Sequence, residues 1–143
     1  MKYVLLLLAT VGIVASALAL REHYRTEGDS PCSINERWDC GIVNHSPYAM
    51  LVGVPVAALG ILGYLLMAVL AWRRAYRPLL AAAVVGLAFS LYLAHIEAHI
   101  LGVWCIYCVI SLADISLITV LALATVMTRL GRVKEKAAMT GHP

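Results

Sequence analysis

Gly102-Val-Trp-Cys105-Ile-Tyr-Cys108-Val109 is the stretch that decides the fold, because a Cys-x-x-Cys pair stands here at the start of an apolar run over residues 109–127. Helical residues three apart share a face, so a helix over this stretch would turn both thiols the same way. A helix N-terminus favours the thiolate, which is the reactive form of cysteine. The spacing predicts a dithiol that closes into a disulfide and reopens, with a static disulfide or half of a zinc site as the alternatives.

The whole chain is unusually apolar. Of its 143 residues, 62% are hydrophobic and 13% are charged, and that charged share is about half of the usual one. This composition excludes an ordinary soluble domain and indicates an integral membrane protein. The basic residues flank apolar runs and no Gly-rich phosphate loop is present, so we expect membrane lipid around the chain and no nucleic-acid partner.

Four apolar runs are about as long as a membrane crossing, which takes roughly 20 residues. They cover residues 3–20, 50–71, 79–100 and 103–127. The sequence therefore predicts an all-α integral membrane protein, an antiparallel four-transmembrane-helix bundle that forms one domain over residues 1–130. A polar cytoplasmic tail, residues 131–143, follows the bundle, and we expect it to be disordered.

An outer loop over residues 21–48 carries the other two cysteines, Cys32 and Cys40. The sequence Gly28-Asp29-Ser30-Pro31 predicts a turn before Cys32. The preceding apolar run has an alternative interpretation as a cleaved signal peptide, because Ala15-Ser-Ala17 and Ala17-Leu-Ala19 resemble signal-peptidase sites. Both interpretations deliver the loop to the outer side of the membrane.

The distribution of positive charge predicts the orientation. Eight of the eleven basic residues belong to one side of a four-span topology: Lys2, Arg73, Arg74, Arg77, Arg129, Arg132, Lys134 and Lys136. The positive-inside rule places this side in the cytoplasm, with both termini. All four cysteines then lie at or beyond the outer face, which is the periplasmic face of a bacterial inner membrane, where disulfides persist.

Two thiol pairs on one side of a membrane can pass electrons between them by thiol–disulfide exchange. Cys32 and Cys40 suit exchange with a soluble dithiol protein, whereas Cys105 and Cys108 suit a lipid-soluble two-electron acceptor such as a quinone. One alternative is a structural membrane protein braced by two static disulfides. The other is a zinc-binding module, which the wide spacing of Cys32 and Cys40 and the oxidising compartment disfavour, so no metal is expected.

The combined pattern resembles the vitamin K epoxide reductase family in its compact four-helix form. The pattern runs from Cys32 over seven residues to Cys40, over five residues to Ser46, and past two spans to Trp104-Cys105-Ile-Tyr-Cys108. The resemblance implies an antiparallel four-helix bundle that encloses a quinone near the outer leaflet. It also implies that Cys108 reacts with the quinone, that Cys40 attacks Cys105, and that Cys32 exchanges with the partner.

The resemblance assigns a supporting role to Ser46, and its position beside Cys105 suggests one for Trp104. Ser46 would support the quinone or the catalytic cysteines through its hydroxyl, and its alternative role is to cap a helix that begins at Pro47. Trp104 would stack near the quinone ring. For Tyr107, anchoring in the aromatic belt of the membrane interface is the better-supported account.

The chain departs from the animal members of this family at two positions. Those members bind the quinone oxygens through an asparagine early in the second span and a tyrosine one turn after the second catalytic cysteine. Aligned on Gly60 and Tyr64, these positions hold Val56 and Leu112. We therefore expect a bacterial-type enzyme that uses ubiquinone or menaquinone and a separate periplasmic thioredoxin-like dithiol partner, with reduction of vitamin K quinone or epoxide as the alternative.

Three ionisable residues in the spans are further candidates. His95 and His99 share a helical face near the outer end of the third span and are candidates for proton supply, hydrogen bonding, or metal or haem binding. Their alternative is an interfacial pair bonded to the loop. Asp114 lies inside the fourth span, where we expect it to be protonated and bonded to Ser90 or Tyr92 rather than to relay protons.

Overall fold

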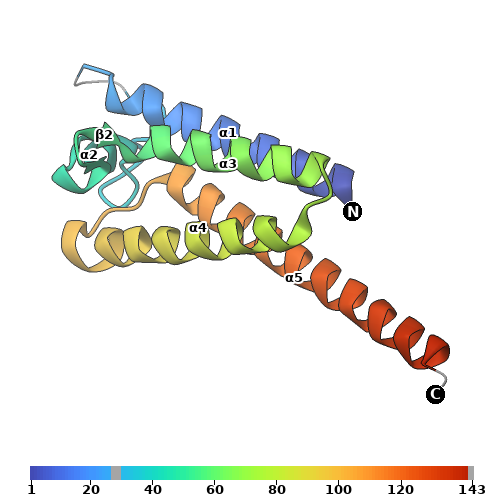
Figure 1. The fold of residues 1–143 in the computed structure, drawn as a ribbon. Coiled ribbons are helices and arrows are strands. Elements are labelled where there is room, and N and C mark those ends of the chain that lie inside the picture. The colour runs from blue at the N-terminus through green and yellow to red at the C-terminus, as the bar shows by residue number, and fades with distance from the viewer. Residues whose placement is uncertain (27–29, 142–143) are drawn as a thin grey trace.

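The structure is a computed structural model that describes residues 1–26 and 30–141. Four long helices alternate in direction along the chain, and both termini lie at the same end of the molecule (Figure 1). These helices are α1 (Lys2–His23), α3 (Val56–Trp72), α4 (Tyr76–Ile96) and α5 (Ile106–Thr140). The prediction of an all-α protein is confirmed, apart from one small two-stranded sheet.

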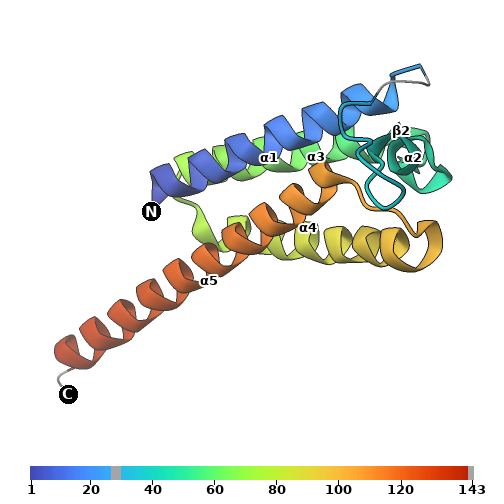
Figure 2. The ribbon, with the colours of Figure 1, turned by 180° about the vertical axis from the view of Figure 1, so that it is seen from behind.

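Short elements fill the connections at the end of the bundle opposite to the termini. Between α1 and α3 lie the short helix α2 (Cys40–His45), the 3₁₀ turn η1 (Pro47–Ala49) and the antiparallel strands β1 (Met50–Leu51) and β2 (Val54–Pro55). A π-helical turn, η2 (Glu97–Leu101), continues α4. Figure 2 shows this cluster of short elements from behind, beside the start of α5.

Three of the four helices are long and apolar enough to cross a membrane, namely α1, α4 together with η2, and α5. The fourth, α3, is apolar but has 17 residues, or about 26 Å at a rise of about 1.5 Å per residue. That length falls slightly short of a hydrocarbon core of about 30 Å. The large apolar side chains exposed on α1, α3, α4 and the first part of α5 are mostly Leu and Val, as expected for contact with lipid.

The predicted start of the second span near residue 50 is wrong. Residues 50–55 form a hairpin whose two-residue loop, Val52 and Gly53, has φ angles of +52° and +79°. A two-residue hairpin loop with both φ values positive matches the right-handed twist of paired strands. Pro55 then takes the N-cap position of α3. Every residue of the hairpin is apolar or glycine, so hydropathy alone merges it with the helix.

The helix α5 also differs from the limits predicted for a fourth span. The helix begins at Ile106, and it continues to Thr140 instead of giving way to a disordered tail. Residues 129–140 contain Arg, Lys, Glu, Ala and Met, which are good helix formers, and no proline. The third span likewise begins earlier than predicted, at Tyr76. Gly28 and Asp29, half of the turn predicted before Cys32, lie outside the described residues.

Close contact between α1 and α3 depends on a glycine. A Cβ atom added at Gly12 would overlap the ring of Tyr64, and one added at Gly60 would lie 2.7 Å from the Ser16 hydroxyl oxygen. Tyr64 is 4% exposed and belongs to the main apolar core with Leu5 and Met67. Gly12 therefore fixes both the spacing of the two helices and the position of the tyrosine.

We expect the substitution Gly12→Ala to lower the stability of the bundle by about 1–3 kcal/mol, because overpacking forces the Tyr64 ring to move. Thermal unfolding of the purified protein in detergent measures this loss. Gly131→Ala is the matched control: it lies in a helix with open space around it, and alanine is favoured over glycine there by about 1 kcal/mol. Equal midpoints for the two variants would contradict the packing argument.

Candidate active site

The four cysteines gather at one end of the bundle, although Cys40 and Cys105 are 65 positions apart in the sequence. Cys32 and Cys40 form a disulfide, whereas Cys105 and Cys108 are free thiols. The Cys40 and Cys105 sulfur atoms are 3.3 Å apart, and both residues are fully buried. The structure thus places a disulfide in direct contact with a thiol of the second pair.

Main-chain hydrogen bonds hold Cys40 against Cys105. The N–H of Asp39 donates to the oxygen of Trp104 at 3.0 Å, and the N–H of Trp104 donates to the oxygen of Arg37 at 2.7 Å. Asp39 is also the N-cap of α2, where its carboxylate accepts the Ile42 N–H at 3.1 Å. The residues just before each cysteine are therefore tied together, and α2 begins at Cys40 itself.

The Cys-x-x-Cys pair lies at the N-terminus of α5, as the sequence predicts. Gly102, with φ of +67°, ends the π-helical turn in the left-handed conformation that favours glycine. Cys105 is the N-cap with extended backbone angles, so it lies just before the helix, whereas Cys108 lies in the first turn. Cys105 is buried and Cys108 is half-buried, which gives the two thiols different surroundings.

Glu97 braces this turn. Its side chain is 2% exposed, and its Oε2 atom accepts the main-chain N–H of Cys105 at 3.1 Å. This bond satisfies one of the N–H groups that a helix N-terminus leaves without a partner. The sequence offers one signal for this residue, an acid in an apolar helix eight positions before Cys105, but none of the motifs includes it.

Asn44 is a second site residue that the motifs do not reveal. Its Nδ2 atom donates to the Cys40 oxygen at 2.8 Å and to the Cys105 sulfur at 3.6 Å, so it bridges the two cysteine pairs. A hydrogen bond from the Cys108 thiol lowers the pKa of Cys105, Asn44 acts in the same direction, and burial opposes them. The only sequence signal for Asn44 is its position one helical turn after Cys40.

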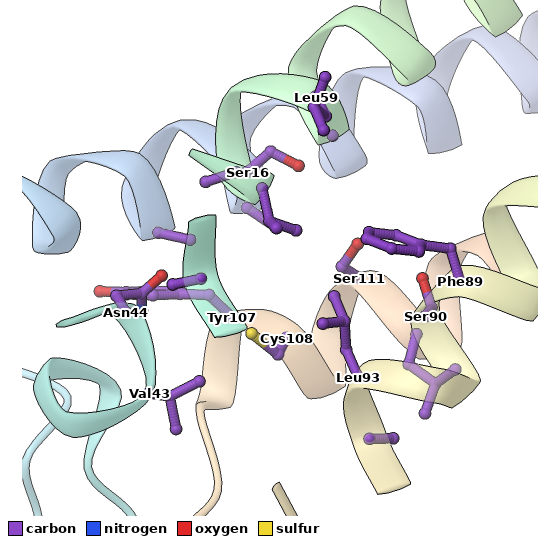
Figure 3. Close-up of a pocket in the computed structure, with 18 of the residues that line it drawn as sticks. Ser16, Val43, Asn44, Leu59, Phe89, Ser90, Leu93, Tyr107, Cys108 and Ser111 are labelled. Carbon is purple, nitrogen blue, oxygen red and sulfur yellow. The ribbon is translucent and has the colours of Figure 1, made fainter. Parts of the chain in front are cut away.

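A cavity of about 340 Å³ lies beside Cys108, enclosed by α1, α3, α4, α5 and the segment from α2 to η1. Small-molecule sites occupy about 300–1,000 Å³ and combine apolar walls with a few polar groups. Figure 3 shows the Cys108 sulfur in this cavity, with Asn44 on one side and Ser111 further along α5. The polar lining includes His23, Asn44, Ser46, Tyr64, Ser90, Glu97, Trp104 and Ser111.

Ser46 and Trp104 both line the cavity. Ser46 is buried, and its hydroxyl donates to the Val43 oxygen at 2.7 Å. It does precede the turn that begins at Pro47, but its side chain makes no cap bond there. Ser46 thus takes the N-cap position that the alternative predicts, without the side-chain cap bond, and it also lies beside the cavity.

His95 and His99 lie outside the cavity lining. Their rings are 4.6 Å apart, and both side chains are exposed. Within residues 1–26 and 30–141, neither histidine forms a hydrogen bond to the loop, and no group of three or more His, Cys, Asp or Glu residues is placed to hold a metal ion. On this turn of the chain, the buried Glu97 faces the cavity instead.

Asp114 does not bond to Ser90 or Tyr92, so that prediction is wrong. Tyr92 is 56% exposed and points away from the bundle, and Ser90 lines the cavity from α4. Asp114 is 4% exposed, and neither carboxylate oxygen has a hydrogen-bond partner among the described residues. Helix periodicity places Asp114 on the face of α5 that turns toward the interior of the bundle.

Comparison with known proteins gives one match. The sequence model of the vitamin K epoxide reductase family matches residues 3–125, a range that contains the four cysteines, the cavity and nearly all of the bundle. No curated protein matches the chain significantly. The family is one of membrane thiol–quinone oxidoreductases, which agrees with a disulfide, a dithiol and a cavity in contact. The chain belongs to the vitamin K epoxide reductase family.

Proposed function

We propose that this protein oxidises a periplasmic thioredoxin-like dithiol protein and reduces a membrane quinone, and so drives disulfide formation. The observation that carries the proposal is the 3.3 Å contact between the Cys40 and Cys105 sulfurs, beside a cavity that Cys108 lines. Electrons entering at the Cys32–Cys40 disulfide have a direct path to the second pair. From there, Cys108 faces the space in which a quinone ring fits.

The outer half of the cycle is exchange with the partner. A partner thiolate attacks the Cys32 sulfur, the Cys32–Cys40 bond breaks, and Cys40 leaves as a thiolate. The partner's second thiol then displaces Cys32, so the partner departs with a disulfide and Cys32 and Cys40 are reduced. Because Cys32 is 3% exposed, we expect the segment around it to move aside when the partner binds.

The inner half passes the two electrons to the quinone. The Cys40 thiolate attacks Cys105 in an oxidised Cys105–Cys108 pair, and Cys108 leaves as a thiolate. Cys32 then attacks Cys40, which restores the outer disulfide and releases Cys105. The reduced inner pair gives two electrons and two protons to the quinone, so a hydroquinone and the Cys105–Cys108 disulfide form. An oxidised outer pair and a reduced inner pair, the arrangement found here, is the state that the proposed cycle requires before this last step.

We further propose that all four long helices cross a bacterial inner membrane, with the cysteines on the periplasmic side. Both termini lie at the end of the molecule away from α2 (Figure 1), the helix that begins at Cys40. That end carries a group of arginines, which the positive-inside rule places in the cytoplasm: Arg73, Arg74, Arg77 and Arg129. Ubiquinone and menaquinone are the proposed acceptors, with reduction of vitamin K quinone or epoxide as the alternative.

The proposal is tested by quinone reduction with purified protein and a reduced thioredoxin-like donor, comparing a naphthoquinone with a benzoquinone. We expect the native chain to reduce at least one of them. Cys105→Ala and Cys108→Ala are each expected to lower the rate by about 1,000-fold or more, because residues that act as one chemical unit are lost together. An inactive native chain whose cysteines also resist thiol trapping would support two static disulfides instead.

A further inference from the structure

A pair of hydroxyl groups lies in the cavity wall one helical turn beyond Cys108. The Tyr64 hydroxyl from α3 is 2.8 Å from the Ser111 hydroxyl oxygen and 3.0 Å from the Ser111 main-chain oxygen. Both residues line the cavity. Ser111 is three residues after Cys108, so the two side chains project from the same face of α5 (Figure 3).

The unpartnered carboxyl of Asp114 lies on the same face, three residues further along α5. It is 4% exposed, and no described residue forms a hydrogen bond to either oxygen. An ionisable residue inside a membrane span is costly, and such residues are usually kept for function. Ser111 and Asp114 are three residues apart on α5, so their side chains are neighbours on the helix surface. Tyr64, Ser111 and Asp114 therefore form one polar group, which we call the hydroxyl site, within an otherwise apolar part of the bundle.

We propose that the hydroxyl site binds the second carbonyl oxygen of a 1,4-quinone whose ring lies against Cys108. The inference rests on the proposed quinone reductase activity and adds the residues that hold the far side of the ring. A 1,4-quinone carries its two oxygens on opposite sides of one ring, and both gain negative charge on reduction. A hydrogen-bond donor at either oxygen stabilises that charge, and the hydroxyl site places one at the oxygen far from Cys108.

The geometry allows Ser111 to donate to the quinone while Tyr64 holds it in place. When the Tyr64 hydroxyl donates to the Ser111 main-chain oxygen, the hydrogen of the Ser111 hydroxyl is free to point into the cavity. Asp114 acts behind them as a positioning residue. In its protonated form it can donate to a hydroxyl of this pair once a side chain rotates, because neither carboxyl oxygen has another partner among the described residues.

The experiment compares the quinone KM and kcat of purified variants with a fixed, saturating dithiol donor. We expect Ser111→Ala and Tyr64→Phe each to raise the quinone KM by about 10-fold, the loss expected for one hydrogen bond. Asp114→Asn retains a donor and is expected to change KM little, whereas Asp114→Leu is expected to raise it. Exchange between the donor and Cys32–Cys40 is expected to stay at the native rate in all four variants.

Ser116→Ala is the matched control. It removes a hydroxyl from the same helix, but that hydroxyl bonds to the Leu112 oxygen at 2.7 Å and does not line the cavity. A second readout needs no turnover: the quinone is expected to raise the thermal midpoint of the native chain and of Ser116→Ala, and to raise that of Ser111→Ala less. If Asp114→Leu fails to fold, the quinone-induced shift of the thermal midpoint in Asp114→Asn still tests the inference.

The outcomes separate this inference from the proposed function. If the native chain neither reduces nor is stabilised by a quinone, the proposed function fails. If the native chain reduces a quinone and the Ser111 and Tyr64 variants keep the KM of Ser116→Ala, the hydroxyl site alone is overturned. A loss of thermal stability with an unchanged KM also overturns it, because the Tyr64–Ser111 bond would then only tie α3 to α5.

Discussion

The double variant Cys32→Ser/Cys108→Ser is expected to form a disulfide between Cys40 and Cys105 in nearly all molecules. The two sulfurs are 3.3 Å apart in the native structure, so small rotations of the side chains suffice to reach the disulfide bond length of about 2 Å. Removing Cys32 and Cys108 deletes the two thiols that would otherwise attack and reopen this bond. Mass spectrometry of peptides from the unreduced protein identifies the bond.

The control for this experiment keeps a different pair of cysteines. Cys32→Ser/Cys105→Ser leaves Cys40 and Cys108 and removes the 3.3 Å sulfur contact that Cys40 makes with Cys105, so a bond between the remaining pair is expected to form more slowly and in a smaller share of molecules. Equal yields from the two double variants would mean that the observed contact does not select the partner of Cys40. Free thiols in both variants would mean that the outer and inner pairs do not exchange.

The sequence predicted the elements of this fold better than their limits. Length and hydropathy located the four apolar runs, but in a membrane helix every face is apolar and periodicity gives no sign of where the helix starts. The hairpin over residues 50–55 is apolar and was therefore merged with α3. The extension of α5 to Thr140 is charged and was taken for a tail, although its residues favour a helix.

The candidate site was predictable where it rests on motif spacing and not where it rests on tertiary contact. The cysteine spacings and the resemblance identified all four thiols and placed Ser46 beside them. The contacts of Asn44 and Glu97 depend on α2 and η2 packing against the start of α5, which no local pattern encodes. For the same reason, helical spacing paired His95 with His99 but could not show that Glu97 is the residue that faces inward.

Substituting Glu97 is expected to have the largest effect of any residue that is not a cysteine. Glu97→Ala leaves the buried N–H of Cys105 without its acceptor, which costs about 1–3 kcal/mol. Because this N–H belongs to the turn that aims Cys105 at Cys40, the rate of quinone reduction is expected to fall by roughly 10- to 100-fold. Thermal unfolding and the quinone assay measure the two effects on the same samples.

Two further variants separate the acceptor role of Glu97 from its acidity. Glu97→Gln keeps a carbonyl oxygen that can accept the Cys105 N–H, so it is expected to regain the stability lost in Glu97→Ala. Glu22→Gln is the matched control, since Glu22 is equally buried but pairs with Arg25 at 3.3 Å and does not line the cavity. It is expected to leave quinone reduction unchanged.

The rate of Glu97→Gln decides why the chain keeps an acid at this position. A native rate would mean that Glu97 serves only as an acceptor for the turn, which an amide can replace. A rate as low as that of Glu97→Ala, at native stability, would mean that the acid itself takes part, because a carboxyl in the cavity can carry a proton between the thiols and the quinone and an amide cannot. Native stability and native rate in Glu97→Ala would contradict both roles.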